Sequence, residues 1–338
     1  MANFIMRRLL LSVPTLLGVL LVCFGLLHLA DADPAGVVGG GVSGRAISAE
    51  ALLHLRSYYG LDQPWYVQFA RLLWRFLSLD LGTSWRDGRP IIDVLSEAMP
   101  VTLLLSLFSL LLSYMVAVPL GAYAAVRSER LVDQALTFVL FVLYSLPSFW
   151  VGTMALAFLA SGRYLDCGGS GCFPIQGFHR LDGFSSLTLF EQITDVLWHL
   201  FLPLATLTYG GLAALSRYTR AALLDVMQMD YIRTARAKGL SERVVVVRHG
   251  LRNSLLPLVT LFGLSLPELV TGSVVVESIF GIRGMGLVTL EAIRLPDYPL
   301  VITNVAAMAL LTVFGVLLSD ILYALVDPRI RGAGRENR

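Results

Sequence analysis

Residues 230–257 read DYIRTARAKGLSERVVVVRHGLRNSLLP and lie between two segments that are apolar enough to cross a bilayer. A loop that only joins two spans can be very short, whereas this one is a long, basic and helix-prone block. Eight lysines and arginines fall between Arg217 and Arg252. Gly239 separates two short helical patterns, because a glycine readily takes the positive φ that ends a helix. The block therefore predicts a shaped element that contacts another molecule.

Each half of the block has its own helix signals. We expect Asp230 to cap a helix that runs through Lys238, and Ser241 to cap the next helix. Val244–Val247 favour a strand by local propensity, but an unpaired strand would expose its edge, so we expect a helix here. Ile232, Ala235 and Gly239 share one face, and the small residues Thr234, Ala235 and Ala237 let another surface approach closely. The alternative to a shaped contact with another molecule is a loop whose arginines only interact with anionic lipid.

The whole chain is far more apolar than a soluble domain. Hydrophobic residues make up 56% and charged residues 15% of its 338 positions, and its mean hydropathy is +0.71, whereas soluble domains carry roughly a quarter charged residues. About 20 apolar residues in a helix cross a hydrocarbon core of about 30 Å. Six runs approach or exceed that length: Leu9–Ala30, Val101–Val126, Ala135–Ala160, Leu200–Leu215 (Val196–Leu224 with its flanks), Ser254–Val276 and Leu300–Val326. We therefore expect an all-α membrane protein with six spans in one domain, residues 1–338.

Charge gives the orientation of these spans. If both termini are cytoplasmic, the inside segments hold 16 basic and 7 acidic residues, and the outside segments 31–98, 161–198 and 277–298 hold 10 basic and 15 acidic residues. Basic residues concentrate in cytoplasmic loops, so the termini and the loop 216–253 are predicted to be cytoplasmic. The first run exceeds the 7–15 apolar residues of a signal peptide, so we expect it to remain as a span.

The segment 31–98 is the one large predicted insertion outside the membrane. Ile47–Tyr59 and Trp65–Leu79 have helical patterns, with Ser48 and Pro64 at their starts. One interpretation is a cap on the bilayer surface, with Trp65, Trp74 and Trp85 as interfacial anchors. The other is a docking surface for an extracytoplasmic partner, and the two are compatible.

Cysteines and histidines give little sign of catalysis or metal binding. Cys167 and Cys172 bracket a Gly-rich loop outside the membrane, where a local disulfide is favoured over a metal site or free thiols. The five histidines are scattered, and no metal site is predicted. The one lysine, Lys238, precedes Gly239 and Leu240, so no G-x-x-x-x-G-K-[ST] loop for ATP exists in this chain.

One acidic residue falls in the middle of the fifth apolar run. An ionised carboxylate at Glu268 costs several kcal/mol there unless it faces a partner or water. With Ser265 and Thr271, it is a candidate for lining a path used by a cationic group. The alternative is a protonated or hydrogen-bonded glutamate at a kink caused by Pro267.

The basic block resembles the EAA loop of ABC-importer permeases, in the variant of the dipeptide/oligopeptide/nickel branch. Residues 230–240, 252–253 and 256–257 carry the match, although Arg233 replaces the glutamate that names the motif, as is common in this branch. Further matching segments follow in order: MRRL at 6–9, YGLDQP at 59–64, LDLGTS at 79–84, PSFW at 147–150, ESIF at 277–280, GMG at 284–286, DYP at 297–299 and DPRI at 327–330. Together they indicate a first-permease, or B-type, subunit.

The resemblance implies a type I importer permease in a bacterial or archaeal cytoplasmic membrane. Such a subunit pairs with a second, related permease, two ATPases that hold ATP and Mg, and an extracytoplasmic substrate-binding protein. It has membrane lipid around it, no role in binding nucleic acid, no cofactor of its own and no enzymatic activity. The residues implied to couple to an ATPase are Asp230, Tyr231, Arg233, Thr234, Ala235, Arg236, Ala237, Lys238, Gly239 and Leu240. Short peptides are the expected cargo; the alternatives are nickel or another small solute, a proton-coupled secondary carrier, and a structural adaptor.

Overall fold

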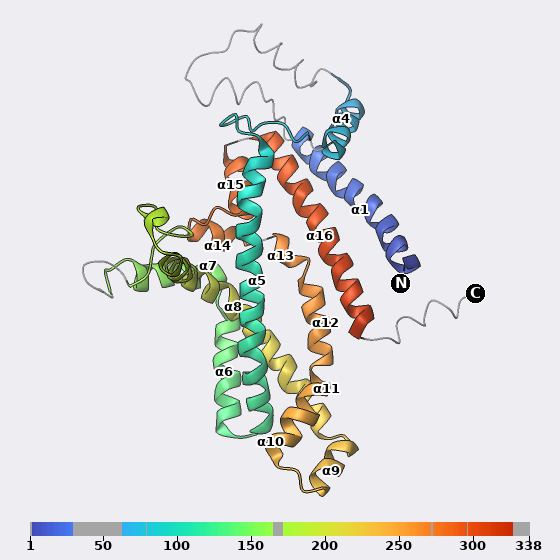
Figure 1. Cartoon of the computed structure of the whole chain (residues 1–338), viewed down its shortest axis with the longest axis vertical. Helices are drawn as coiled ribbons and strands as arrows, with labels where there is room; N and C mark the ends of the chain where they lie inside the picture. Colours follow the sequence, from blue (N-terminus) through green and yellow to red (C-terminus); the bar gives the residue numbers. More distant parts are fainter. Residues whose placement is uncertain are drawn as a thin grey trace.

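The computed structural model describes residues 2–29, 63–78, 80–164, 172–271, 273–295 and 297–326. Its central feature is the helix α5 (Ile91–Val126), which runs along most of the long axis of the molecule (Figure 1). The helices α8 (Leu189–Met227), α12 (Leu256–Ser265) and α16 (Tyr298–Val326) pack around it. In the described ranges the ordered elements are helical, apart from an isolated β-bridge between Thr83 and Pro90.

Small residues bring α5 and α8 into close contact. A Cβ atom on Gly121 would lie 2.6 Å from the Thr219 Cβ atom and also against the Ser216 carbonyl oxygen. The Ser216 hydroxyl donates to the Ala117 carbonyl at 3.1 Å, and it is buried. In a membrane, such small-residue contacts and inter-helix hydrogen bonds replace the hydrophobic drive that packs soluble helices.

The helix α1 (Ala2–Leu29) lies along α16, and α4 (Trp65–Leu77) crosses its end (Figure 1). Phe24 and Phe69 join α1 to α4 with ring centroids 5.5 Å apart. Pro64 precedes α4, as the sequence indicates, but as the N-cap and not as the first helical residue. The predicted helix Ile47–Tyr59 lies outside the described residues.

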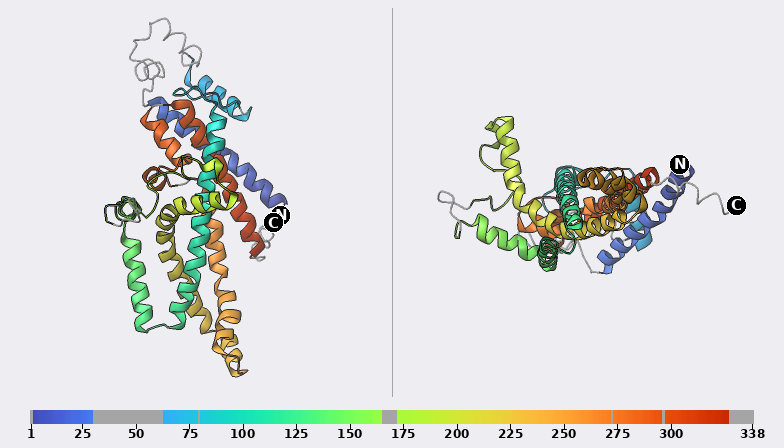
Figure 2. Two further views of the ribbon diagram at one scale, coloured as in Figure 1. Left: turned by 60° about the vertical axis from the view of Figure 1, so that its left-hand side comes forward. Right: turned by 90° about the horizontal axis from the view of Figure 1, so that it is seen from below.

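Two of the six apolar runs, the third and the fifth, are broken helices in the structure. The third run becomes α6 (Leu131–Ser145), α7 (Ser148–Ala155) and the π-helix η1 (Leu156–Ala160), and the chain bends by 94° between α6 and the α7–η1 stretch. Pro147 causes the break, because it disfavours helical dihedrals in the residue before it. Figure 2 shows α7 and the first turns of α8 projecting away from the main bundle.

The fifth run, Ser254–Val276, is divided further. It becomes α11 (Arg252–Ser254), α12, α13 (Glu268–Thr271) and α14 (Val274–Ile279). Pro267 separates α12 from α13, since a proline lacks the N–H group that continues a helix. The next helix is α15 (Met285–Arg294). The fourth run, in contrast, is longer than expected, because α8 continues on both sides of it.

Among the described residues, three helices are long and apolar enough to span a membrane: α5, α8 and residues 298–321 of α16. The pair formed by α6 and the α7–η1 stretch adds a fourth if it is one broken span. The apolar part of α1, Leu10–Gly25, is shorter. The six spans and the cytoplasmic termini therefore stay predictions.

The start of α6 is tied to α8 by a charge pair whose carboxylate is buried. Arg220 donates to both carboxylate oxygens of Asp133, at 2.7 and 2.6 Å. Asp133 is 3% exposed and also accepts the Glu129 N–H at 3.1 Å. This last bond accompanies the left-handed backbone of Glu129, whose φ is 67°. A planar guanidinium that binds a carboxylate through two hydrogen bonds fixes both distance and angle.

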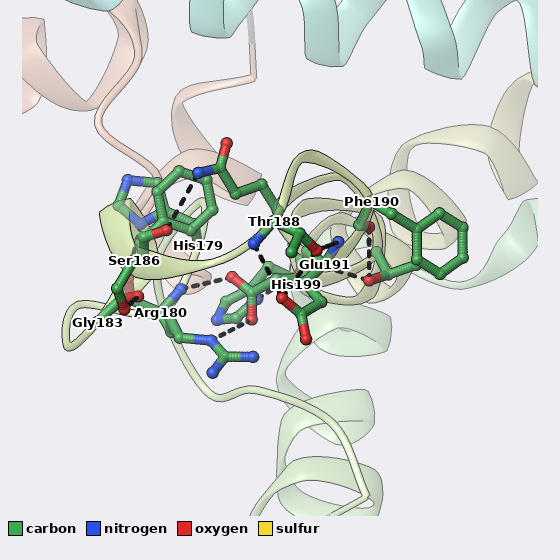
Figure 3. A network of polar contacts seen from close by, with 12 residues as sticks. His179, Arg180, Gly183, Ser186, Thr188, Phe190, Glu191 and His199 are labelled. Carbon is green, nitrogen blue, oxygen red and sulfur yellow. Dashed lines mark hydrogen bonds and ion pairs between the residues drawn. The ribbon is translucent and has the colours of Figure 1, made fainter.

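The loop before α8, which contains the 3-10 turn η2 (Phe184–Ser186), is closed by a polar network (Figure 3). Thr188 and Glu191 form a capping box at the start of α8. Asp195 accepts from the backbone and the side chain of Arg180, at 2.8 and 3.1 Å. This network gives each of these groups a structural partner.

Candidate functional site

The basic block forms a helix, a glycine turn and a second helix at the end of the molecule where α5 meets α6 (Figure 1). Its parts are α9 (Asp230–Ala237), α10 (Glu242–Val244) and the π-helix η3 (Val245–Leu251). Gly239 has φ +78°, a conformation that L side chains rarely adopt. The predicted helix–glycine–helix arrangement is confirmed, and Val244–Val247 are helical as expected.

The two predicted caps need correction. The N-cap of α9 is Met229, and Asp230 is the first helical residue, so its side chain does not cap the helix. Asp230 instead forms an exposed ion pair with Arg233 at 3.6 Å. In the first turn of α9, its carboxylate also interacts favourably with the positive end of the helix dipole. Ser241 does take the N-cap position of α10, but without a side-chain hydrogen bond.

The buried face of α9 is turned toward its own chain. Ile232 and Ala235 are 0% and 6% exposed and form a small core with Val245, against Val226 and Met227 of α8. The expectation that Ala235 is a small residue presented to another molecule is therefore wrong. Its small size instead lets α9 lie close to η3 and α8. Gly239, expected on the same face, is exposed.

The π-helix η3 is pressed against α8 in turn. A Cβ atom on Gly250 would lie 3.0 Å from the Leu223 Cδ1 atom and 3.2 Å from the Met227 Sδ atom. Leu223 and Val246 belong to the small core that fills this contact. The block is thus carried as one piece on the end of the long helix α8.

The outer surface of the block is exposed and basic. Exposed side chains from the predicted coupling set are Asp230, Tyr231, Arg233, Thr234, Arg236, Ala237, Lys238 and Leu240. Residues 230–253 hold six basic and two acidic residues. Both acids are paired with arginines, Asp230 with Arg233 and Glu242 with Arg236. The remaining positive charge suits a partner surface with carboxylates or backbone carbonyls.

Two polar contacts hold the ends of α9. Arg236 donates to both oxygens of Glu242, at 2.7 and 3.2 Å. These hydrogen bonds hold the pKa of the Glu242 carboxyl below its ordinary value. At the other end, the Asn253 amide donates to the Tyr231 hydroxyl at 2.8 Å.

The three candidate path residues gather around the break at Pro267. Ser265 ends α12 and donates to the Leu261 carbonyl at 3.0 Å, while Glu268 begins α13 and is exposed. Thr271 ends α13. In Figure 1 this break lies about halfway along α5. The backbone of Pro267 packs on Gly315 of α16, where a Cβ atom would be 2.9 Å from the Pro267 Cα atom.

One fully buried carboxylate, that of Glu277, was not among the predicted site residues. Glu277 accepts the Thr102 hydroxyl and the Leu287 N–H, both at 2.9 Å. Thr102 also accepts the Met285 N–H at 2.8 Å. The available signal was the glycine spacing at 284 and 286, because a Cβ on Gly286 would be 2.9 Å from the carboxylate of Glu277.

The remaining candidate groups have structural partners. Cys172 is disulfide-bonded, and Cys167 lies outside the described residues, so their pairing stays a prediction. His179 stacks on Phe184 with centroids 4.1 Å apart, and the His199 Nδ1 atom lies 2.8 Å from the Asp195 carbonyl (Figure 3). Within the described ranges, no group of three or more His, Cys, Asp or Glu residues is arranged to hold a metal ion.

Comparisons with known proteins agree with this arrangement. The family described as "Binding-protein-dependent transport system inner membrane component" matches residues 117–332, and its N-terminal counterpart matches residues 1–106. The oligopeptide transport system permease protein AppB of Bacillus subtilis is 39% identical over 98% of this chain and 99% of its own length. The dipeptide transport system permease protein DppB of Escherichia coli K12 is 35% identical, with 98% and 99% covered.

The fold also has a solved counterpart. A chain from inward-facing structures of the MetNI methionine ABC transporter superposes with a TM-score of 0.53 at 17% identity, covering 70% of this chain and 98% of that one. The shared fold is that of a type I importer permease. The chain therefore belongs to the family of inner-membrane components of binding-protein-dependent transport systems, and it is a multi-pass B-type permease subunit of an ABC importer, not an enzyme, with ATP handled by partner ATPase subunits.

Proposed function

We propose that this chain forms half of the translocation path of an importer for short peptides. The names of its relatives, which refer to oligopeptide, dipeptide and D,D-dipeptide transport systems, support that cargo. The observation that carries the coupling role is the seating of α9: a short basic helix rests on the end of α8 and leaves its outer face exposed. A push on α9 would move a spanning helix directly.

The other half of the path is a second, related permease, in a heterodimer. Two ATPase subunits bind ATP and Mg, and one of them receives α9 of this chain in a groove on its surface. A substrate-binding protein delivers cargo from outside. Membrane lipid surrounds the assembly, and nucleic acid has no part in it. The docking residues are the exposed members of the predicted set other than Arg236, which is bonded to Glu242. Ala235 supports them from beneath and Gly239 makes the turn.

Glu268, Ser265 and Thr271 line the path at the break between α12 and α13. A carboxylate at this depth is costly unless it meets water or a cation, and Glu268 is exposed on this chain. It would meet the amino terminus of a passing peptide. Such a role favours peptides with a free amino terminus over a neutral solute.

Reconstitution tests the proposal. In proteoliposomes with both permeases, both ATPases and the binding protein, a labelled dipeptide or tripeptide should enter only with ATP. Transport by this chain alone under a proton gradient would indicate a secondary carrier. Nickel uptake in place of peptide uptake would indicate the metal-importing alternative, and ATP-dependent assembly without any cargo movement would indicate an adaptor.

Cross-linking tests the docking surface separately. In a Cys23→Ser background, a photoreactive maleimide on Lys238→Cys should capture an ATPase subunit of the assembled complex. The control is Tyr218→Cys, which is 59% exposed on α8 outside the block. Capture from Tyr218→Cys but not from Lys238→Cys would contradict docking through α9.

A further inference from the structure

The basic block, residues 230–257, can bend most easily at the turn around Gly239. Only Lys238–Ser241 connect α9 to α10, and no Cβ atom stiffens the glycine in their middle. The hydrophobic seat holds α9 through Ile232 and Ala235 on one side only. A force on the exposed face of α9 would therefore bend the turn instead of moving α8, unless another contact holds the two helices on either side of the turn together.

That contact is the ion pair between Arg236 and Glu242, which spans the turn. Arg236 is in the last turn of α9 and Glu242 is the first residue of α10. The guanidinium donates to both carboxylate oxygens, at 2.7 and 3.2 Å. Two parallel hydrogen bonds between planar groups fix an angle as well as a distance, which a single lysine contact would not.

We propose that Arg236 and Glu242 are positioning residues, which lock the angle between α9 and η3 so that α9 transmits force to α8. The inference rests on the proposed coupling role of the block. It assigns Arg236 to an intramolecular bond and removes it from the residues that touch the ATPase. The contact between Asn253 and Tyr231 serves the opposite end of α9 in the same way.

The burial of the pair sets the size of the expected effect. The two side chains are 43% and 55% exposed, so solvent screens their attraction. Exposed pairs change equilibria modestly, and reversing one charge replaces attraction with repulsion. We expect each single reversal, Arg236→Glu or Glu242→Arg, to lower the amount of peptide moved per ATP by about two- to fivefold.

The decisive variant is the exchanged pair, Arg236→Glu with Glu242→Arg. The complete importer is reconstituted, and a labelled tripeptide and released phosphate are counted together. Hydrogen exchange of residues 230–239 is followed on the same complexes, because it reports on the position of α9 whatever the cargo. We expect residues 230–239 to exchange faster, and less peptide to move per ATP, in both single variants. In the exchanged pair, both the exchange rate and the peptide moved per ATP should return most of the way to the values of the unmodified complex.

Two controls match the change of charge. Arg217→Glu and Asp225→Arg reverse exposed charges on α8 outside the block, and both should leave exchange and coupling unchanged. An exchanged pair no better than the worse single variant would overturn the inference and indicate that Arg236 contacts the ATPase itself. Single variants without effect would overturn it too. If Lys238→Cys does not cross-link to an ATPase in a complex that carries both Arg236 and Glu242, the docking role on which the inference rests is refuted instead.

Discussion

At the scale of single residues, the least expected feature is the carboxylate of Glu277. It is fully buried, and its two oxygens join α14 to Thr102 of α5 and to the Leu287 N–H of α15. A buried polar group is stable only when its hydrogen bonds are complete. The consecutive helices α14 and α15 are thus joined through one side chain to α5, which is far from them in sequence.

Replacing this side chain should therefore destabilise the protein. Glu277→Ala leaves the Thr102 hydroxyl and the Leu287 N–H without this acceptor, and each unsatisfied group costs about 1–3 kcal/mol. We expect the purified complex to unfold at a clearly lower temperature in a thermal melt. Glu291→Ala is the control, since its side chain is 38% exposed and its ion pairs within the described residues are long, at 3.6 and 3.9 Å. Equal melting temperatures for both variants would contradict this role of Glu277.

At the scale of elements, the sequence predicted the helices better than their breaks. The long helices α5 and α16 follow directly from apolar runs, because length and hydropathy suffice to recognise a spanning helix. The helix α8 extends well beyond its apolar run, Leu200–Leu215. Pro147 and Pro267 break helices, whereas Pro119 and Pro203 lie inside α5 and α8. Which proline breaks a helix depends on neighbours that repair the lost hydrogen bond, and those neighbours are known only from the fold.

In the candidate site, too, one part was predictable from the sequence and another was not. The helix–glycine–helix order of residues 230–251 was predictable, because the backbone freedom of Gly239 acts locally and ends the first helix. The direction of each face was not, and Ala235 was expected to face outward although Val245 covers it. A short helix with few apolar residues gives little pattern from which to choose its buried side.

The close contact between α5 and α8 leads to a prediction about glycine. Gly121→Ala would place a methyl group 2.6 Å from the Thr219 Cβ atom, and overpacking of this kind typically costs about 1–3 kcal/mol. We expect a lower yield of folded complex and a lower melting temperature. Gly18→Ala in α1 has no atom within 4 Å of the added methyl group, so it should be neutral or slightly stabilising. An unchanged melting temperature for Gly121→Ala would mean that the helices separate more easily than their packing indicates.

The seat of α9 gives a second prediction at this scale. Ala235→Glu would bury a carboxylate beside Ile232 and Val245, which costs more than unseating the helix. We expect transport to fall about tenfold or more, as 1.4 kcal/mol of lost docking already corresponds to tenfold. Trypsin should also cut the freed helix faster at Arg233. The matched change Ala221→Glu, at an exposed position of α8, should have neither effect, and normal protection of Arg233 in Ala235→Glu would contradict the seat.

At the scale of the whole molecule, the fold places the basic loops at one end and the segments predicted to lie outside the membrane at the opposite end. The α5–α6 turn, with Arg127 and Arg130, and the α9 block lie at one end, while α15 and the loop before α5 lie at the other (Figure 1). The basic loops of the sequence are thus brought together by the fold. Because basic loops stay in the cytoplasm, the α9 end should face the ATPases, and the opposite end should face the binding protein.

Labelling of intact cells tests this orientation. Leu181 is 93% exposed in the loop before α8, and Lys238 is exposed next to the turn of the α9 block. In a Cys23→Ser background, a membrane-impermeant maleimide should label Leu181→Cys in intact spheroplasts. It should label Lys238→Cys only after the membrane is opened, because the orientation predicted from charge puts that side chain on the cytoplasmic side. Labelling of Lys238→Cys in intact spheroplasts would reverse the topology and place the coupling block where no ATPase is found.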